Sequence, residues 1–83
     1  MNKITMQDLR EAKRLNRYVV EKPSAFYLNR IGGDDLKKPS VVLRSGTVVE
    51  VVKVYRRGRA ALLRYVDRSG KTWWSWTHAT EYE

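Results

Sequence analysis

The sequence contains no cysteine and only one histidine, His78. Without thiols the chain cannot form a disulfide, a thiolate nucleophile or a cysteine-based zinc or iron–sulfur site. One histidine leaves few of the groups that metal binding and acid–base catalysis use, and no serine lies in the setting of a nucleophile. We therefore expect no catalytic residue, no metal, no cofactor and no enzyme activity.

Long hydrophobic runs are also missing. The apolar pairs Val48-Val49 and Val51-Val52 are interrupted by charge within a few residues, so we expect no segment that spans a bilayer. The first five residues lack an apolar stretch of signal-peptide length. These features favour a cytoplasmic protein with no membrane partner, and the brevity of the chain favours a phage or bacterial origin.

Positive charge is what the chain has in excess. Its 83 residues include 17 Lys and Arg against 9 Asp and Glu, which gives a net charge of +8 at pH 7. We expect residues 1–83 to form a single domain, because independent domains seldom fall below about 50 residues. A short chain with this much positive charge favours a polyanion as its partner.

An N-terminal helix is expected over residues 5–21. Thr5 and Asp8 have the spacing of a capping box, which starts a helix. Pro23 prevents the helix from continuing much further. At helical spacing, one apolar stripe is formed by Leu9, Ala12, Leu15 and Val19.

Four cations line the opposite side of this helix: Arg10, Lys13, Arg14 and Arg17. This basic ridge is a secondary candidate for contact with a polyanion. Charged helix faces are usually only solvated, so that interpretation stays open beside the functional one.

Residues 22–40 are expected to be a connecting loop region, because turn-forming Pro, Gly and Asp residues are dense there. Within it, the segment 25–28 fits either a short strand or a buried turn of helix. Asp34 and Asp35 have no third carboxylate nearby, so we interpret them as a turn and not as a Mg²⁺ site.

The pattern becomes that of β-strands from Val41 onward. Expected strands are residues 41–43, 47–55, 60–66 and 71–76, with a short extended piece around 79–82. Short turns between them predict an antiparallel meander that curls strongly. In the turn at residues 56–59, Gly58 is expected to take the positive φ. The fold class is therefore α+β, mainly β: an N-terminal helix followed by a small, strongly curved antiparallel sheet.

The run Gly46-Thr47-Val48-Val49-Glu50-Val51, a glycine followed by valines and later a basic turn, resembles the opening of a KOW-type or Tudor-type SH3-like barrel. The resemblance covers residues 41–83 and implies an SH3-like β-barrel with a nucleic-acid or ribonucleoprotein role. The chain departs from the KOW pattern at residues 52–55, which extend the strand where a second glycine-rich stretch should follow.

Cations and aromatic residues alternate through the β part. Arginine meets phosphate with bidentate geometry and exposed rings stack unpaired bases, so this mixture favours a non-catalytic nucleic-acid-binding module. The candidate binding residues are Lys53, Tyr55, Arg56, Arg57, Arg59, Arg64, Arg68 and Trp73. Trp73 and Trp74 must point to opposite faces of a strand. The alternative interpretation places Tyr65, Trp74 and Trp76 in the core.

Other partners remain open at this point. Arg and Trp also anchor protein interfaces, so a small regulator or inhibitor that binds an acidic surface of a larger bacterial or phage enzyme is the alternative function. A methyl-lysine or methyl-arginine reader is the least favoured, because a basic chain suits a basic peptide poorly. Sequence leaves DNA and RNA undistinguished. The strand 41–43 could pair between copies, so we expect a monomer or weak dimer.

Overall fold

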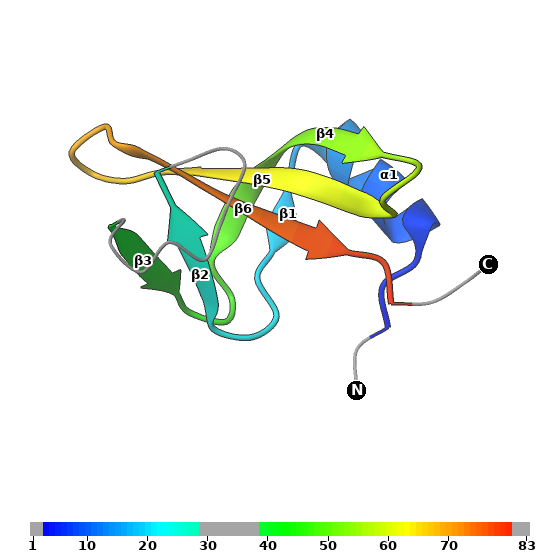
Figure 1. Ribbon diagram of the computed structural model, residues 1–83, viewed down its shortest axis with the longest axis horizontal. Helices are drawn as coiled ribbons and strands as arrows, with labels where there is room; N and C mark the ends of the chain where they lie inside the picture. The colour runs from blue at the N-terminus through cyan, green and yellow to red at the C-terminus, as the bar shows by residue number, and fades with distance from the viewer. Residues whose placement is uncertain (1–2, 29–38, 81–83) are drawn as a thin grey trace.

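A six-stranded antiparallel sheet curls into a half-barrel, with one helix at one end (Figure 1). The computed structural model describes residues 3–28 and 39–80. The elements are α1 (Met6–Leu15), β1 (Tyr18–Val19), β2 (Ser24–Tyr27), β3 (Ser40–Leu43), β4 (Val48–Tyr55), β5 (Ala60–Val66) and β6 (Thr72–His78). The strand order is β1-β4-β5-β6-β2-β3. The predicted class, α+β and mainly β with a strongly curved antiparallel sheet, is confirmed.

The start of the helix is as expected, but its end is not. Thr5 accepts a hydrogen bond from the Asp8 amide, and the Asp8 carboxylate accepts one from the Thr5 amide, which completes the capping box. The helix ends at Leu15, so the predicted span 5–21 is wrong. Asn16 adopts a left-handed conformation, with φ 52° and ψ 42°, and asparagine is the residue after glycine that best tolerates this C-terminal position. Its side-chain oxygen also accepts from the Val51 amide at 3.1 Å, which ties the helix end to β4.

The early helix end changes the apolar stripe. Met6 and Leu9 are buried and Ala12 is partly buried, but Leu15 is 56% exposed and Val19 is 42% exposed. The predicted stripe is therefore correct only in its first half. The chain beyond Asn16 instead forms β1, which pairs with β4.

The prediction that residues 22–40 form a connecting loop region is only partly correct. Ser24–Tyr27 forms β2, which pairs along its length with β3 and at Tyr27 with Trp74 of β6. The open choice for residues 25–28 is therefore decided in favour of a strand, in which Phe26 is 1% exposed. Residues 29–38, with Asp34 and Asp35, lie outside the described part of the chain.

The hairpins of the second half agree with the sequence. Turns at residues 56–59 and 67–70 join β4 to β5 and β5 to β6. The expected piece at 79–82 is not a strand in its described part: the Thr80 amide instead donates to the Ile4 carbonyl at 2.7 Å, and residues 81–83 lie outside the description. One irregularity was not predicted, a register shift between Val51 and Lys53 that makes Val52 a β-bulge.

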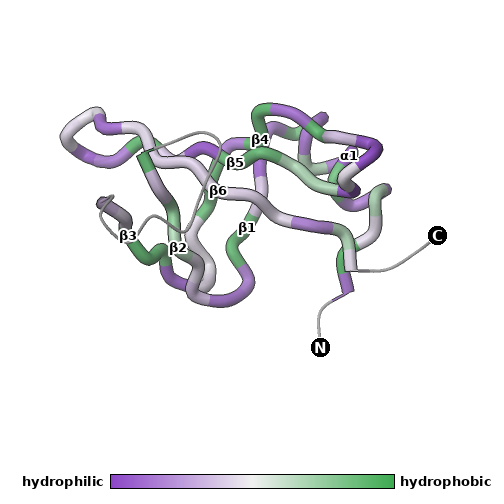
Figure 2. The backbone as a smooth tube through the Cα atoms, viewed as in Figure 1, coloured by the Kyte–Doolittle hydropathy of each residue, from purple (hydrophilic) through white to green (hydrophobic). Residues whose placement is uncertain are grey.

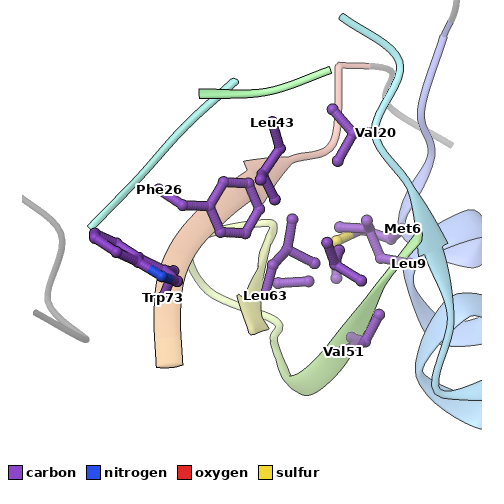
Figure 3. Packing of buried hydrophobic residues seen from close by; sticks show 10 residues of the cluster. Met6, Leu9, Val20, Phe26, Leu43, Val51, Leu63 and Trp73 are labelled. Atoms are coloured by element: carbon purple, nitrogen blue, oxygen red, sulfur yellow. The ribbon is translucent and has the colours of Figure 1, made fainter. Parts of the chain in front are cut away.

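The core fills the concave side of the sheet. Figure 3 shows side chains from the helix and the strands pointing to a common centre, with Met6 and Leu9 at the helix end and Trp73 beside Phe26 at the other. Leu63 of β5 lies between these two groups. Figure 2 shows the first part of β5 in the green of hydrophobic residues, in the middle of the sheet. The edge strand β3 carries Val42, which is 65% exposed.

Candidate nucleic-acid interface

The three tryptophans of β6 divide between the two faces of the sheet. Trp73 is only 6% exposed and belongs to the core, so its prediction as a binding residue is wrong. Its indole Nε1 donates to Asp67 at 2.9 Å, which satisfies the one polar group of the buried ring. Trp74 and Trp76 alternate with it and lie partly exposed on the outer, convex face. Neither belongs to the core cluster, contrary to the alternative interpretation.

Hydrogen bonds explain why β6 turns its less apolar side inward. Ser75 and Thr77 share the inner face with Trp73 because strand side chains alternate. Ser75 donates its hydroxyl to the Ala25 carbonyl at 3.0 Å, and the Thr77 hydroxyl lies 3.1 Å from that of Tyr18. The curled sheet brings β1 and β2 close to these positions, so small hydroxyl side chains fit there and the two larger rings are left outside.

The outer face contains a second, smaller apolar group. Ala60 and Leu62 of β5 are 4% and 2% exposed, yet neither belongs to the core cluster. Their register explains this, since Leu62 lies between Lys53 of β4 and Trp76 of β6 on the outer side. Neighbouring side chains on the outer face therefore cover Ala60 and Leu62. This is unusual, because one face of a small antiparallel sheet is commonly open to solvent.

The bulge at Val52 determines which β4 residues reach this face. Val49 and Val51 point inward before the bulge, and Val54 is packed against the core after it. Because one extra residue shifts the two-residue alternation, Lys53 and Tyr55 lie on the outer face. Without the bulge, the same alternation would turn Lys53 into the core.

Rings and cations meet closely on the outer face. The ring centroids of Tyr55 and Trp76 are 5.3 Å apart and tilted by 51°. The Lys53 ammonium lies 5.1 Å from the centre of the Tyr55 ring, and the Arg64 guanidinium lies 5.9 Å from that of Trp74. Both separations fall within the range of cation–π attraction. Arg64 is also paired with Glu50 at 2.6 Å, and both side chains are partly exposed.

The turn after β4 carries three of the predicted arginines, Arg56, Arg57 and Arg59. The residue with positive φ is Arg59, at 51°, and not Gly58 as expected. A depression of about 590 Å³ opens between this turn and the outer face. It is lined by Lys53, Val54, Tyr55, Arg56, Arg57, Gly58, Ala60, Trp76 and His78. The lining therefore combines aromatic and aliphatic groups with cations.

Arg68 lies away from the other predicted residues. It belongs to the turn at residues 67–70, whereas Arg56–Arg59 lie at the opposite end of β5 (Figure 1). A strand of seven residues separates the two turns by roughly 20 Å. One ligand group cannot contact both, so we no longer group Arg68 with the candidate site.

The helix ridge meets the site at one position. Arg10 and Arg56 line an open depression of about 410 Å³ together with Met6 and Val54. Arg14 is instead engaged by Glu11, and their ion pair lowers the pKa of the Glu11 carboxyl and raises the pKa of Arg14. Lys13 and Arg17 are exposed. Only the Arg10 end of the ridge therefore extends the basic surface around the β4–β5 turn.

The sequence missed Trp74 and Trp76 as surface residues. Because Trp73 and Trp74 are adjacent on a strand, one of the two rings must lie on the outer face, but the sequence does not show which one. The neighbouring strand gives no help, because residues 60–63 are all apolar and show no alternation. The pattern of β6 favours the wrong assignment, because Ser75 and Thr77 share a face with Trp73 and hydroxyl residues are mostly exposed.

Within residues 3–28 and 39–80, no three His, Asp or Glu side chains come together as a metal ion would require. No helix in this part of the chain is long and apolar enough to cross a membrane. The chain matches no protein-family model, no curated protein sequence and no solved structure.

Proposed function

We propose that the protein is a non-catalytic nucleic-acid-binding module that uses the outer face of β4, β5 and β6. The observation that carries the proposal is the outer face itself, where Tyr55, Trp74 and Trp76 lie among cations. Basic side chains attract phosphates, and partly exposed rings offer faces to bases. The fold supports it by analogy only: a small curled sheet is the architecture of SH3-like barrels of the KOW and Tudor type, and we propose that relation for residues 41–83.

The revised set of binding residues is smaller than the sequence indicated and better connected. It consists of Lys53, Tyr55, Arg56, Arg57, Arg59, Arg64, Trp74 and Trp76, with Arg10 beside Arg56. Trp73 leaves the set because it is buried. We propose a cytoplasmic protein that acts as a monomer or weak dimer, with DNA or RNA as partner.

The direct test is binding of labelled DNA and RNA, single-stranded and duplex, titrated from low to physiological salt. Replacing Arg56, Arg57 and Arg59 together by alanine should lower the slope of log affinity against log salt by about 2 to 3, since each phosphate contact contributes about 0.7 to 0.9. The control is Arg68→Ala, at the far end of β5, which should leave the slope unchanged, since one lost phosphate contact would already lower it by about 0.7 to 0.9. Binding that is equal for all polyanions and unaffected by the triple substitution would contradict the proposal.

One observation favours the alternative partner, an acidic surface on a larger bacterial or phage protein. The depression beside Tyr55 and Trp76 has apolar walls with cations at its margin, and protein interfaces place aromatic anchors in such hollows. A protein partner should bind with weaker salt dependence and should be lost on Trp76→Ala. Because Trp76→Ala would also weaken nucleic-acid stacking, the discriminating result is the absence of DNA and RNA binding at physiological salt, which would favour the protein partner.

A further inference from the structure

We propose that the ligand of the outer face is an unpaired strand, with one base in the depression beside Tyr55 and Trp76 and the neighbouring base at Trp74. This inference rests on the proposed function and narrows it to single-stranded nucleic acid. It follows from three features of the described residues: the depression, the spacing of the two rings on β6, and the positions of the cations around them.

The depression has the size and walls that an isolated base requires. About 590 Å³ is available, between Tyr55, Trp76 and the small side chain of Ala60. The rings of Tyr55 and Trp76 are tilted by 51° and so do not stack face to face on each other. Their centroids are only 5.3 Å apart, so the two rings touch and a base lies against them in the depression, not between them. Unstacked bases are recognised on aromatic side chains in this way.

The spacing of Trp74 and Trp76 argues against a duplex. The two rings lie on one face of β6, two residues apart, which places their attachment points about 6.6 Å apart along the strand. Neighbouring bases within a duplex strand are separated by only about 3.4 Å. Adjacent nucleotides can therefore occupy both positions only if the strand is extended and its bases are neither paired nor stacked on each other.

Cations are available for the backbone of such a strand. Lys53 lies beside Tyr55, and Arg64, which a phosphate would share with Glu50, lies beside Trp74, one row further along the sheet. Arg56 and Arg57 continue the line at the depression. The net charge of +8 gives the long-range attraction that any polyanion would feel, whereas this row of cations beside rings fits a chain of alternating phosphates and bases.

The test compares three ligands of equal length: a thymine single strand, the same strand with abasic sites throughout, and a duplex. Each is titrated against the whole protein and against Trp76→Leu and Trp74→Leu, which keep an apolar side chain opposite Leu62 and Arg64, respectively. We expect the base-containing strand to bind at least tenfold more tightly than the abasic strand or the duplex. Each substitution should weaken its binding roughly 5- to 150-fold, because stacking contributes about 1 to 3 kcal/mol per base. Abasic-strand binding should stay within twofold.

The outcomes separate this inference from the function on which it rests. If all three ligands bind with equal, salt-dependent affinity that the arginine substitutions reduce, the protein binds nucleic acid through charge alone and the inference is overturned. If no ligand binds at physiological salt, the proposed function fails with it. Far-ultraviolet circular dichroism and thermal unfolding of both variants show whether they fold; the abasic strand provides a second check, because a misfolded variant would lose that binding as well.

Discussion

The turn at one end of β5 is organised around a carboxylate, whereas the turn at the other end is made of arginines. In the first, Asp67 accepts four hydrogen bonds, from the Ser69 amide and hydroxyl, the Lys71 amide and the Trp73 indole. A glycine, Gly70, takes the positive φ of 87°. In the second, a backbone bond of 3.4 Å joins Arg59 to Arg56, and Arg59 itself has a positive φ.

The two turns contribute to the protein in different ways. Gly70 adopts its conformation without steric cost, and the Asp67 bonds connect the turn to the buried ring of Trp73, so the first turn stabilises the fold. In the second turn, the left-handed conformation falls on a long side chain for which it costs about 1–2 kcal/mol. A strained position is retained when its side chain is useful, which favours a binding role for the arginine turn.

Among substitutions that test this comparison, the largest loss of stability should come from Trp73, whose indole binds the carboxylate turn from inside the core. Trp73→Ala should destabilise the protein by about 3–5 kcal/mol, because a buried ring is lost and Asp67 loses a donor. For so small a domain this is a large part of the total stability. Denaturant unfolding measures it, with Trp76→Ala as the control on the outer face; equal losses would mean that the two rings are equivalent in packing.

Asp67 should show an intermediate effect that depends on pH. Hydrogen bonds from Trp73 and then Ser69 lower the pKa of this carboxyl from its ordinary 3.8 to about 2. Because the folded pKa lies below the unfolded one, the stabilisation is complete above about pH 4 and is lost as the pH falls toward 2. Thermal unfolding followed from pH 7 to pH 2 should show this loss, and Asp67→Asn should reduce it.

The same substitution tests the contact with Trp73 atom by atom. One oxygen of Asp67 accepts from Ser69 and Lys71, and among the described residues the other accepts from the indole alone. An asparagine can keep the first set but then directs its NH₂ group at the indole N–H, so two donors oppose each other. Adding Trp73→Phe removes that opposition. The cost of Asp67→Asn should therefore be smaller in the Trp73→Phe background; an unchanged cost would place the stabilisation elsewhere.

The smallest effect should come from the arginine turn. Arg59→Gly should stabilise the protein by up to about 1 kcal/mol, because glycine adopts positive φ freely and the gain is partly offset by the entropy of the unfolded chain. Unfolding in denaturant measures the gain, and Arg57→Gly in the same turn is the control, since Arg57 has no positive φ. If Arg59→Gly were as destabilising as Arg57→Gly, the conformation of Arg59 would not be strained.

Local signals explain what could be predicted of the fold. The capping box at Thr5, the two hairpin turns and the fold class follow from short stretches of sequence, and all are confirmed. The helix end at Leu15 was missed because strong helix formers continue beyond it, and the competing demand for β1 beside β4 comes from tertiary pairing. Asparagine is common as a left-handed residue at helix ends, so Asn16 was the local signal for the C-terminal boundary of the helix.

The site was harder to predict because it depends on which way strands face. Lys53 and Tyr55 reach the outer face through the bulge at Val52, which no local pattern announces. The candidate set grouped Arg68 with Arg59, although the expected hairpins already placed them in turns at opposite ends of one strand, which cannot meet. Charge and aromatic content therefore identified the kind of surface, while the assignment of individual rings required the three-dimensional register.

The hydrogen bonds between Ile4 and Thr80 affect the order in which the chain can fold during synthesis. The Ile4 amide donates to the Thr80 hydroxyl at 2.9 Å, and the Thr80 amide returns a bond to the Ile4 carbonyl, across 76 positions of sequence. During synthesis α1 emerges early and can meet β4 once that strand exists, but its first residues are fixed only after Thr80 has been added. Closing so long a loop carries an entropic cost that local hairpins avoid. We therefore expect the nascent chain to form its β4–β5–β6 meander first and to secure the helix last.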